Sequence, residues 1–223
     1  MIRQFGTGDF LYLVTAMQWT VMLSAIAFVG GGLLGLVLTV LRVSPWRPAQ
    51  WLVTGYVQLF QGTPLLMQLF VFYFGFGIFG FDVPAIVAAS TALVLYAAAF
   101  LADIWRGCIQ AIPAGQWEAA RALGLRFVLS VWLVILPQAV RIAVPPTVGF
   151  LVQVVKNTSL ASIVGYVELT RAGQVINNAT FQPFTVFLVV AGLYFALCFP
   201  LSLLSRRLER RLRTGGAPMR AVP

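Results

Sequence analysis

The sequence predicts an all-α membrane protein with about five transmembrane helices. Hydrophobic residues make up 60% of the 223 residues and charged residues only 9%, a balance that soluble domains do not have. Four long stretches contain no Asp, Glu, Lys or Arg: residues 10–41, 48–81, 83–102 and 172–205. Each stretch has at least the ~20 residues that a helix needs to cross the hydrocarbon core.

The expected spans cover about residues 18–41, 62–81, 83–103, 138–163 and 183–205. The fourth has weaker hydropathy and is placed there because the chain must cross once more after a polar segment. Pro64 and Pro183 suit the first position of a helix, whereas Pro145, Pro146 and Pro200 fall inside spans and should kink them. We therefore expect a single membrane domain over residues 1–223 that ends in a basic tail at 206–223.

The distribution of arginine predicts an outer N-terminus and a cytoplasmic C-terminus. With this orientation the cytoplasmic side carries twelve Arg against three acidic residues, and the outer side two Arg against three acidic residues. The excess charge borders the membrane, so the pI near 10.6 indicates contact with lipid headgroups rather than with nucleic acid. The cytoplasmic arginines are Arg42, Arg47, Arg106, Arg121, Arg126, Arg141, Arg206, Arg207, Arg210, Arg211, Arg213 and Arg220.

Several chemistries are excluded by composition. The chain has no His, so it has neither a His-based general base nor a His metal ligand. Cys108 and Cys198 are far apart in sequence and imply no disulfide or metal framework. There is no P-loop motif, so any ATP must be hydrolysed by another chain. We expect no catalytic residue, no metal and no cofactor in this chain.

The polar segment between the third and fourth spans predicts a short cytoplasmic helix at about 115–126. Helical spacing places Glu118 and Arg121 on one face, where they can pair with each other or with a partner. Ala120 and Gly124, four residues apart, would form a flat strip that lets a groove wall approach closely. Spacing alone leaves two interpretations open: a docking helix, or an ordinary surface helix with solvated charges.

A longer pattern favours the docking helix. Glu118, Ala119, Ala120 and Gly124, followed by Leu136-Pro137, resemble the EAA signature of permease subunits of ABC importers. Val134 stands where that signature usually has Ile. The resemblance implies that this helix docks in a groove of a cytoplasmic ATPase and transmits its movement to the pore. It also implies that ATP and Mg²⁺ bind to that partner chain.

Three further stretches resemble the polar amino-acid branch of these permeases, which imports glutamine, glutamate, arginine and histidine. They are QGTPLLMQLFVFYFG at 61–75, the segment 101–124 and KNTSLASIVGYVELTRAGQ at 156–174. The resemblance implies a type I (MetI-like) permease fold in the bacterial inner membrane. It also implies a second permease subunit, identical or different, and a periplasmic amino-acid-binding protein. Gln61, Asp103 and Asn157 depart from the residues usual in this branch, which are Arg, Glu and Asp.

Lys156 is the one Lys of the sequence, and it is predicted near the outer edge of the fourth span. If the helix enters the membrane near Pro137, Lys156 lies roughly 28 Å further along. One interpretation is that its ammonium group snorkels outward to water. The other is that Lys156 faces the translocation path and meets a substrate carboxylate. Polar residues beside it would then add neutral hydrogen bonds: Gln153, Asn157, Thr158 and Ser159.

Two functions fit this sequence. The favoured one is the membrane-spanning subunit of an ATP-driven amino-acid importer, and the alternative is an ion-coupled secondary carrier. A carrier normally needs intramembrane carboxylates, which the four charge-free stretches lack. Because Asn157 replaces an Asp, a neutral or acidic amino acid of the glutamine or glutamate type is favoured over arginine or lysine.

Overall fold

In the computed structural model, which describes residues 4–78 and 80–214, every regular element of this part of the chain is a helix. The longer helices are α1 (Thr7–Val43), α2 (Arg47–Gly62), α3 (Leu65–Ile78), α4 (Ala85–Gln110), α7 (Leu136–Asn157) and α9 (Pro183–Thr214). The shorter ones are α5 (Ala114–Ala122), α6 (Phe127–Ser130), the π-helical turn η1 (Val131–Ile135), the 3₁₀ turn η2 (Thr158–Ser162) and α8 (Leu169–Thr180).

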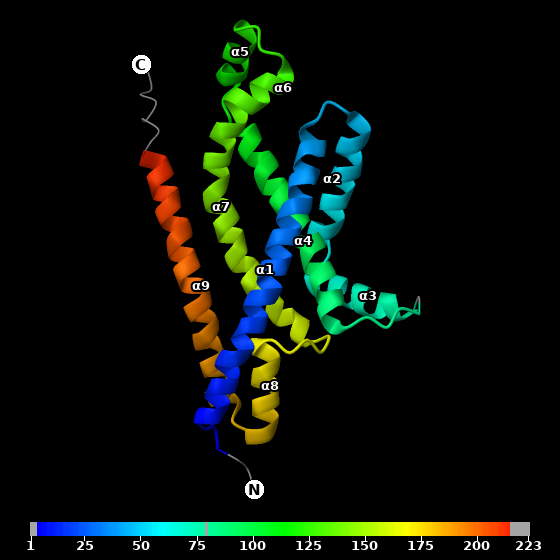
Figure 1. Ribbon diagram of the computed structural model, residues 1–223, viewed down its shortest axis with the longest axis vertical. Coiled ribbons are helices and arrows are strands. Elements are labelled where there is room, and N and C mark those ends of the chain that lie inside the picture. The colour runs from blue at the N-terminus through cyan, green and yellow to red at the C-terminus, as the bar shows by residue number, and fades with distance from the viewer. Residues whose placement is uncertain (1–3, 79, 215–223) are drawn as a thin grey trace.

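The molecule is elongated, and its long helices run along its longest axis (Figure 1). Four helical stretches are long and apolar enough to cross a membrane, namely Thr7–Val43, Ala85–Gln110, Phe127–Ser162 and Pro183–Leu212. Figure 1 shows α5 and α6 at one end, which we call the α5 end, and α8 with the start of α1 at the other, the α8 end. Because α9 runs away from the α8 end, the described part of the chain begins and ends at opposite ends of the molecule.

The second span differs from the expected single helix at 62–81. The chain instead forms α2 and α3, which meet at a bend of 103°. With 14 residues, α3 is only about 21 Å long, too short to cross the ~30 Å core alone. The bend follows from Pro64, which has no N–H to continue α2. The Gln68 side-chain amide fills the corner, where it donates to the Phe60 carbonyl at 2.9 Å and the Thr63 carbonyl at 3.1 Å.

The remaining spans occur close to the expected positions but are longer. Helix α1 begins at Thr7 rather than near residue 18, and the fourth span begins at Phe127 rather than near 138. Helix α9 starts at Pro183, as the sequence predicts, and continues through the first part of the expected tail to Thr214. Residues 215–223 of that tail lie outside the described residues. Pro145, Pro146 and Pro200 lie inside helices α7 and α9.

Helices α1 and α4 make the most extensive contact in the fold. Gly31 and Gly35 of α1 lie against the α4 backbone, and a Cβ added to Gly31 would be 2.5 Å from the Ala97 Cβ. Two small residues four apart in an apolar span thus allow the two helices to approach closely. Near the α5 end, an Arg42 guanidinium nitrogen lies 2.7 Å from an Asp103 carboxylate oxygen and ties the same two helices together.

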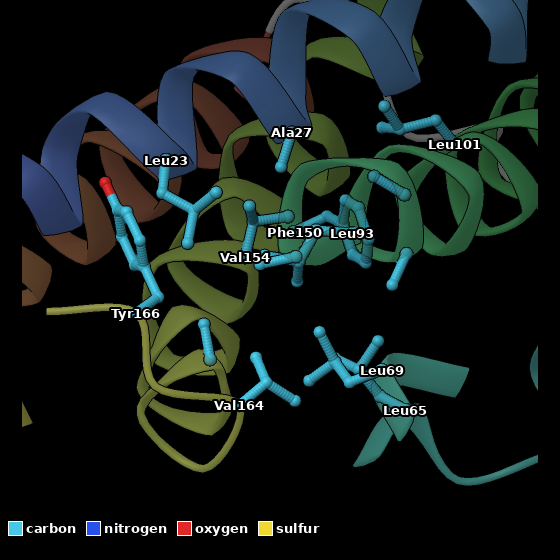
Figure 2. Close-up of a cluster of buried hydrophobic side chains, with 14 residues drawn as sticks. Leu23, Ala27, Leu65, Leu69, Leu93, Leu101, Phe150, Val154, Val164 and Tyr166 are labelled. Atoms are coloured by element: carbon cyan, nitrogen blue, oxygen red, sulfur yellow. The ribbon is translucent and has the colours of Figure 1, made fainter. Parts of the chain in front are cut away.

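One apolar cluster joins four of the helices and the segment after η2 (Figure 2). Leu23 and Ala27 of α1 meet Leu93 of α4 and Val154 of α7, and all four are buried. Leu65 and Leu69 attach the short α3 to this core. The cluster explains why the broken second span stays beside α4 although it leaves the direction of the other helices.

Candidate functional site

The short helix expected at about 115–126 is present as α5 (Ala114–Ala122), an exposed helix at the α5 end of the molecule (Figure 1). It begins directly after Pro113, whose fixed φ suits a helix start. Glu118, Ala119 and Arg121 are all exposed. No ion pair joins Glu118 to Arg121 in the described part of the chain, so both charges are available to a partner.

Gly124 does not lie on the helix, although residues 115–126 were expected to be helical. Helix α5 ends at Ala122, and Gly124 adopts a left-handed conformation with φ of +75°. The Gly124 N–H donates to the Arg121 carbonyl at 2.9 Å, and the Leu125 N–H donates to the Ala120 carbonyl at 3.1 Å. This pair of bonds is a Schellman cap, in which glycine avoids the strain that a Cβ would bring.

The prediction that Ala120 and Gly124 form a flat strip on the helix surface is therefore wrong. Ala120 is only 2% exposed, because it faces the rest of the protein rather than a partner. Trp117 also turns inward, and its ring stacks on Phe127 of α6 with centroids 6.1 Å apart. The surface that α5 offers is formed instead by Glu118, Ala119 and Ala122, beside Arg121. Arg121 and Trp117 also line a hollow of about 430 Å³ between α5 and α6.

The five polar residues predicted to line a path lie together at the end of α7 and the start of η2. Lys156 and Gln153 are exposed, Asn157 and Ser159 are half-buried, and Thr158 is buried. The two hydroxyl groups are engaged locally: Thr158 donates to the Val155 carbonyl at 2.8 Å and Ser159 to the Lys156 carbonyl at 2.7 Å. Their protons are therefore not free for a ligand.

The Asn157 side chain has a free donor. Its oxygen accepts a hydrogen bond of 3.0 Å from the Gln153 amide, whereas its Nδ2 atom is buried without a partner within the described structure. Tyr96 of α4 lies beside this amide and belongs to an aromatic group with Phe100 and Phe150. An unpaired buried N–H is costly, so this position favours an acceptor such as a carboxylate oxygen.

Glu168, one of the three acidic residues that the arginine distribution assigns to the outer side, is a buried carboxylate at the α8 end. Glu168 is 0% exposed and caps α8 by accepting the Arg171 N–H at 2.9 Å. The Tyr194 hydroxyl of α9 donates to it at 2.6 Å, and the Thr20 hydroxyl of α1 at 3.4 Å. Glu168 stands directly before the amphipathic helix α8, where a capping residue is expected, and this position was a sequence signal of its role. Its two side-chain partners, Tyr194 and Thr20, come from distant segments of the chain.

Burial raises the pKa of the Glu168 carboxyl, while the hydrogen bonds that it accepts act in the opposite direction. With a native pKa above the ordinary value of 4.5, the folded protein binds more protons than the unfolded chain. The free energy of unfolding should therefore fall as the pH rises above about 4.5. Glu168→Gln should remove this part of the pH dependence, measured as the unfolding temperature in detergent from acid to neutral pH.

Glu118→Gln is the matched control for this prediction. Glu118 is exposed, so its replacement should leave the pH profile of the wild type unchanged. An identical profile for the wild type and Glu168→Gln would contradict the assignment of that pH dependence to Glu168.

The fold and the site define a class: a helical membrane protein with a broken second span and an exposed helix after its third. Residues 31–214 match the model of one protein family, described as binding-protein-dependent transport system inner membrane component. The chain belongs to this family. Membership decides against the ion-coupled secondary carrier and places the protein in the inner membrane.

Individual relatives are similar over most of their length. The probable glutamine ABC transporter permease protein GlnM of Bacillus subtilis is 37% identical, over 86% of this chain and 89% of the relative. The histidine/lysine/arginine/ornithine transport system permease protein HisM of Salmonella typhimurium is 35% identical, over 90% of this chain and 89% of the relative. A crystal structure of an amino acid ABC transporter with histidines has a chain that is 32% identical, with a TM-score of 0.86 over 90% of this chain and 94% of that one.

Proposed function

We propose that this chain forms the translocation path of an ATP-driven importer for a polar amino acid. The observation that carries the proposal is α5, which exposes Glu118 and Ala119 in the EAA-like segment at the arginine-rich end of the molecule. A short polar helix that rests on the membrane helices and turns its charged residues outward suits docking on a soluble partner. The names of the relatives support amino acids as the substrate class.

The proposed complex contains several chains. Separate ATPase subunits bind ATP and Mg²⁺ at the α5 end, and a second permease subunit, identical or different, completes the path. A periplasmic binding protein delivers the amino acid at the α8 end. One chain with five crossings buries too little to enclose a path by itself, which supports the need for the second subunit.

The proposed orientation places the α5 end in the cytoplasm. Arg42 and Arg47 lie where α1 ends and α2 begins, at the same end as α5. Arg206, Arg207, Arg210 and Arg211 lie in the last turns of α9, which run toward that end. Arginine borders the cytoplasmic face of membrane proteins, so this clustering supports a cytoplasmic C-terminus.

Lys156 and Asn157 are the proposed contacts for the substrate carboxylate. The Lys156 ammonium group is exposed, and the Asn157 Nδ2 atom lacks a partner. All amino acids carry a carboxylate, so these two groups do not select a side chain. With Asn157 in place of a carboxylate, we propose a neutral or acidic amino acid of the glutamine or glutamate type.

The test is binding of labelled glutamine to the purified permease–ATPase complex without its binding protein. Lys156→Ala should weaken binding about tenfold, because a charge-assisted hydrogen bond is lost. Ser159→Ala is the control, since its hydroxyl bonds to its own helix. Glutamate should compete and arginine should not. Strong competition by arginine, undiminished in Lys156→Ala, would overturn both the proposed substrate and the role of Lys156. Failure of an ATPase subunit to co-purify would overturn the importer itself.

A further inference from the structure

The helix that follows α5 contains a π-helical turn, η1, between α6 and α7. The Leu136 N–H donates to the Val131 carbonyl, five residues back instead of the usual four. Pro137 follows at once and has no N–H, so the Leu133 carbonyl receives no donor from the position that would pair with it in an α-helix. The regular ladder is thus interrupted at this turn, and π-turns of this kind are frequent at functional sites.

Gln138 links the two sides of this interruption. Its side-chain amide donates to the Val134 carbonyl of η1 at 2.7 Å. The same amide lies 3.3 Å from the Gln116 side-chain oxygen of α5. One half-buried side chain of α7 therefore contacts both the π-turn and the exposed helix.

Apolar side chains also pack α5 against the π-turn η1. Ile135 of η1 is fully buried and packs with Ile112, just before α5, and with Ala139 of α7. Trp117 of α5 and Val134 pack against this group. A displacement of α5 must therefore press on the π-turn. Because α7 continues directly from η1, a rotation at the turn displaces α7, which contains Pro145 and Pro146 midway and ends with the polar residues Lys156 and Asn157.

We infer that η1 is the joint through which movement of α5 passes into α7, and that Gln138 is the positioning residue that holds this joint together. The inference rests on the proposed docking of α5 on an ATPase. It extends the proposed function because it assigns the transmission of movement from α5 to α7 to the turn η1 and to the Gln138 side chain. The interrupted ladder lets the turn deform, while the Gln138 amide keeps α5 and the turn moving as a unit.

The experiment compares Gln138→Met with Gln50→Met in proteoliposomes that contain the complete complex. Methionine keeps the length of the side chain and removes its donor. Gln50 is a matched control at the same end of the molecule, since its amide also donates to a main-chain carbonyl, that of Ser44, at 2.7 Å. We expect Gln138→Met to lower the amino acid transported per ATP hydrolysed about tenfold, with the hydrolysis rate retained. Gln50→Met should keep the wild-type ratio.

A wild-type transport ratio in Gln138→Met would overturn the inference. So would an equal loss of transport and hydrolysis, because that result indicates a merely structural role. If Gln138→Met does not assemble, Gln138→Glu provides the same test, since it keeps the shape and the acceptor but removes the donor. A wild-type complex that hydrolyses ATP without transporting any amino acid would contradict the proposed function instead.

Discussion

Gly31→Ala is expected to destabilise the protein by roughly 1–3 kcal/mol, a large effect for one methyl group. The new Cβ would lie 2.5 Å from the Ala97 Cβ, 3.1 Å from the Ala98 nitrogen and 3.1 Å from the Val94 oxygen. Two of these neighbours are backbone atoms and the third is fixed to the backbone, so none can rotate away. Helices α1 and α4 would have to separate, and the unfolding temperature in detergent should fall accordingly.

Gly32→Ala is a matched control in the next position of the same helix. A Cβ there would meet only the tip of the Trp105 ring, at 4.0 Å. Alanine is also the better helix former by about 1 kcal/mol, so this variant should be as stable as the wild type or more stable. If Gly31→Ala behaved like Gly32→Ala, the close contact of α1 and α4 would not be what fixes their packing.

The close contact of α1 and α4 was predictable, because small residues four apart in an apolar span usually serve helix packing. The charge-free stretches likewise predicted three of the four helices that are long and apolar enough to cross a membrane, since a charge in the hydrocarbon core is costly whatever the fold. The bend between α2 and α3 was not predictable from apolar character alone. It depends on Pro64 and on Gln68, whose amide reaches back to the Phe60 carbonyl, eight residues earlier.

The positions of the candidate functional residues likewise depend on contacts that the sequence does not show. The sequence located the short exposed helix α5, but it placed Gly124 on the helix because periodicity does not show where the left-handed cap falls. The interior position of Ala120 depends on how α5 rests on η1. Glu168 was counted only as one of the charges of the outer side. Its burial depends on Thr20 and Tyr194, which are 148 and 26 residues away in sequence.

Ala119→Trp is expected to abolish coupling between the ATPase and transport. Ala119 is exposed on the outward surface of α5 next to Glu118, so a large indole there would occupy the space that the proposed ATPase groove needs. The side chain points away from the core, and the membrane fold should remain intact. Uptake in proteoliposomes should drop at least tenfold. The same preparation should show reduced co-purification of the ATPase or hydrolysis that no longer drives uptake.

Ala196→Trp provides the comparison that separates docking from a general effect of bulk. Ala196 is exposed in the middle of α9 between Phe195 and Phe199, which are 63% and 46% exposed. An indole among these apolar side chains suits a lipid-facing surface, so transport should remain near the wild-type rate. Normal transport in Ala119→Trp with the ATPase bound would show that the outward surface of α5 is not the docking surface. Ala120 and Trp117 are packed against the rest of the protein and cannot take its place, so the proposed coupling through this surface would be wrong.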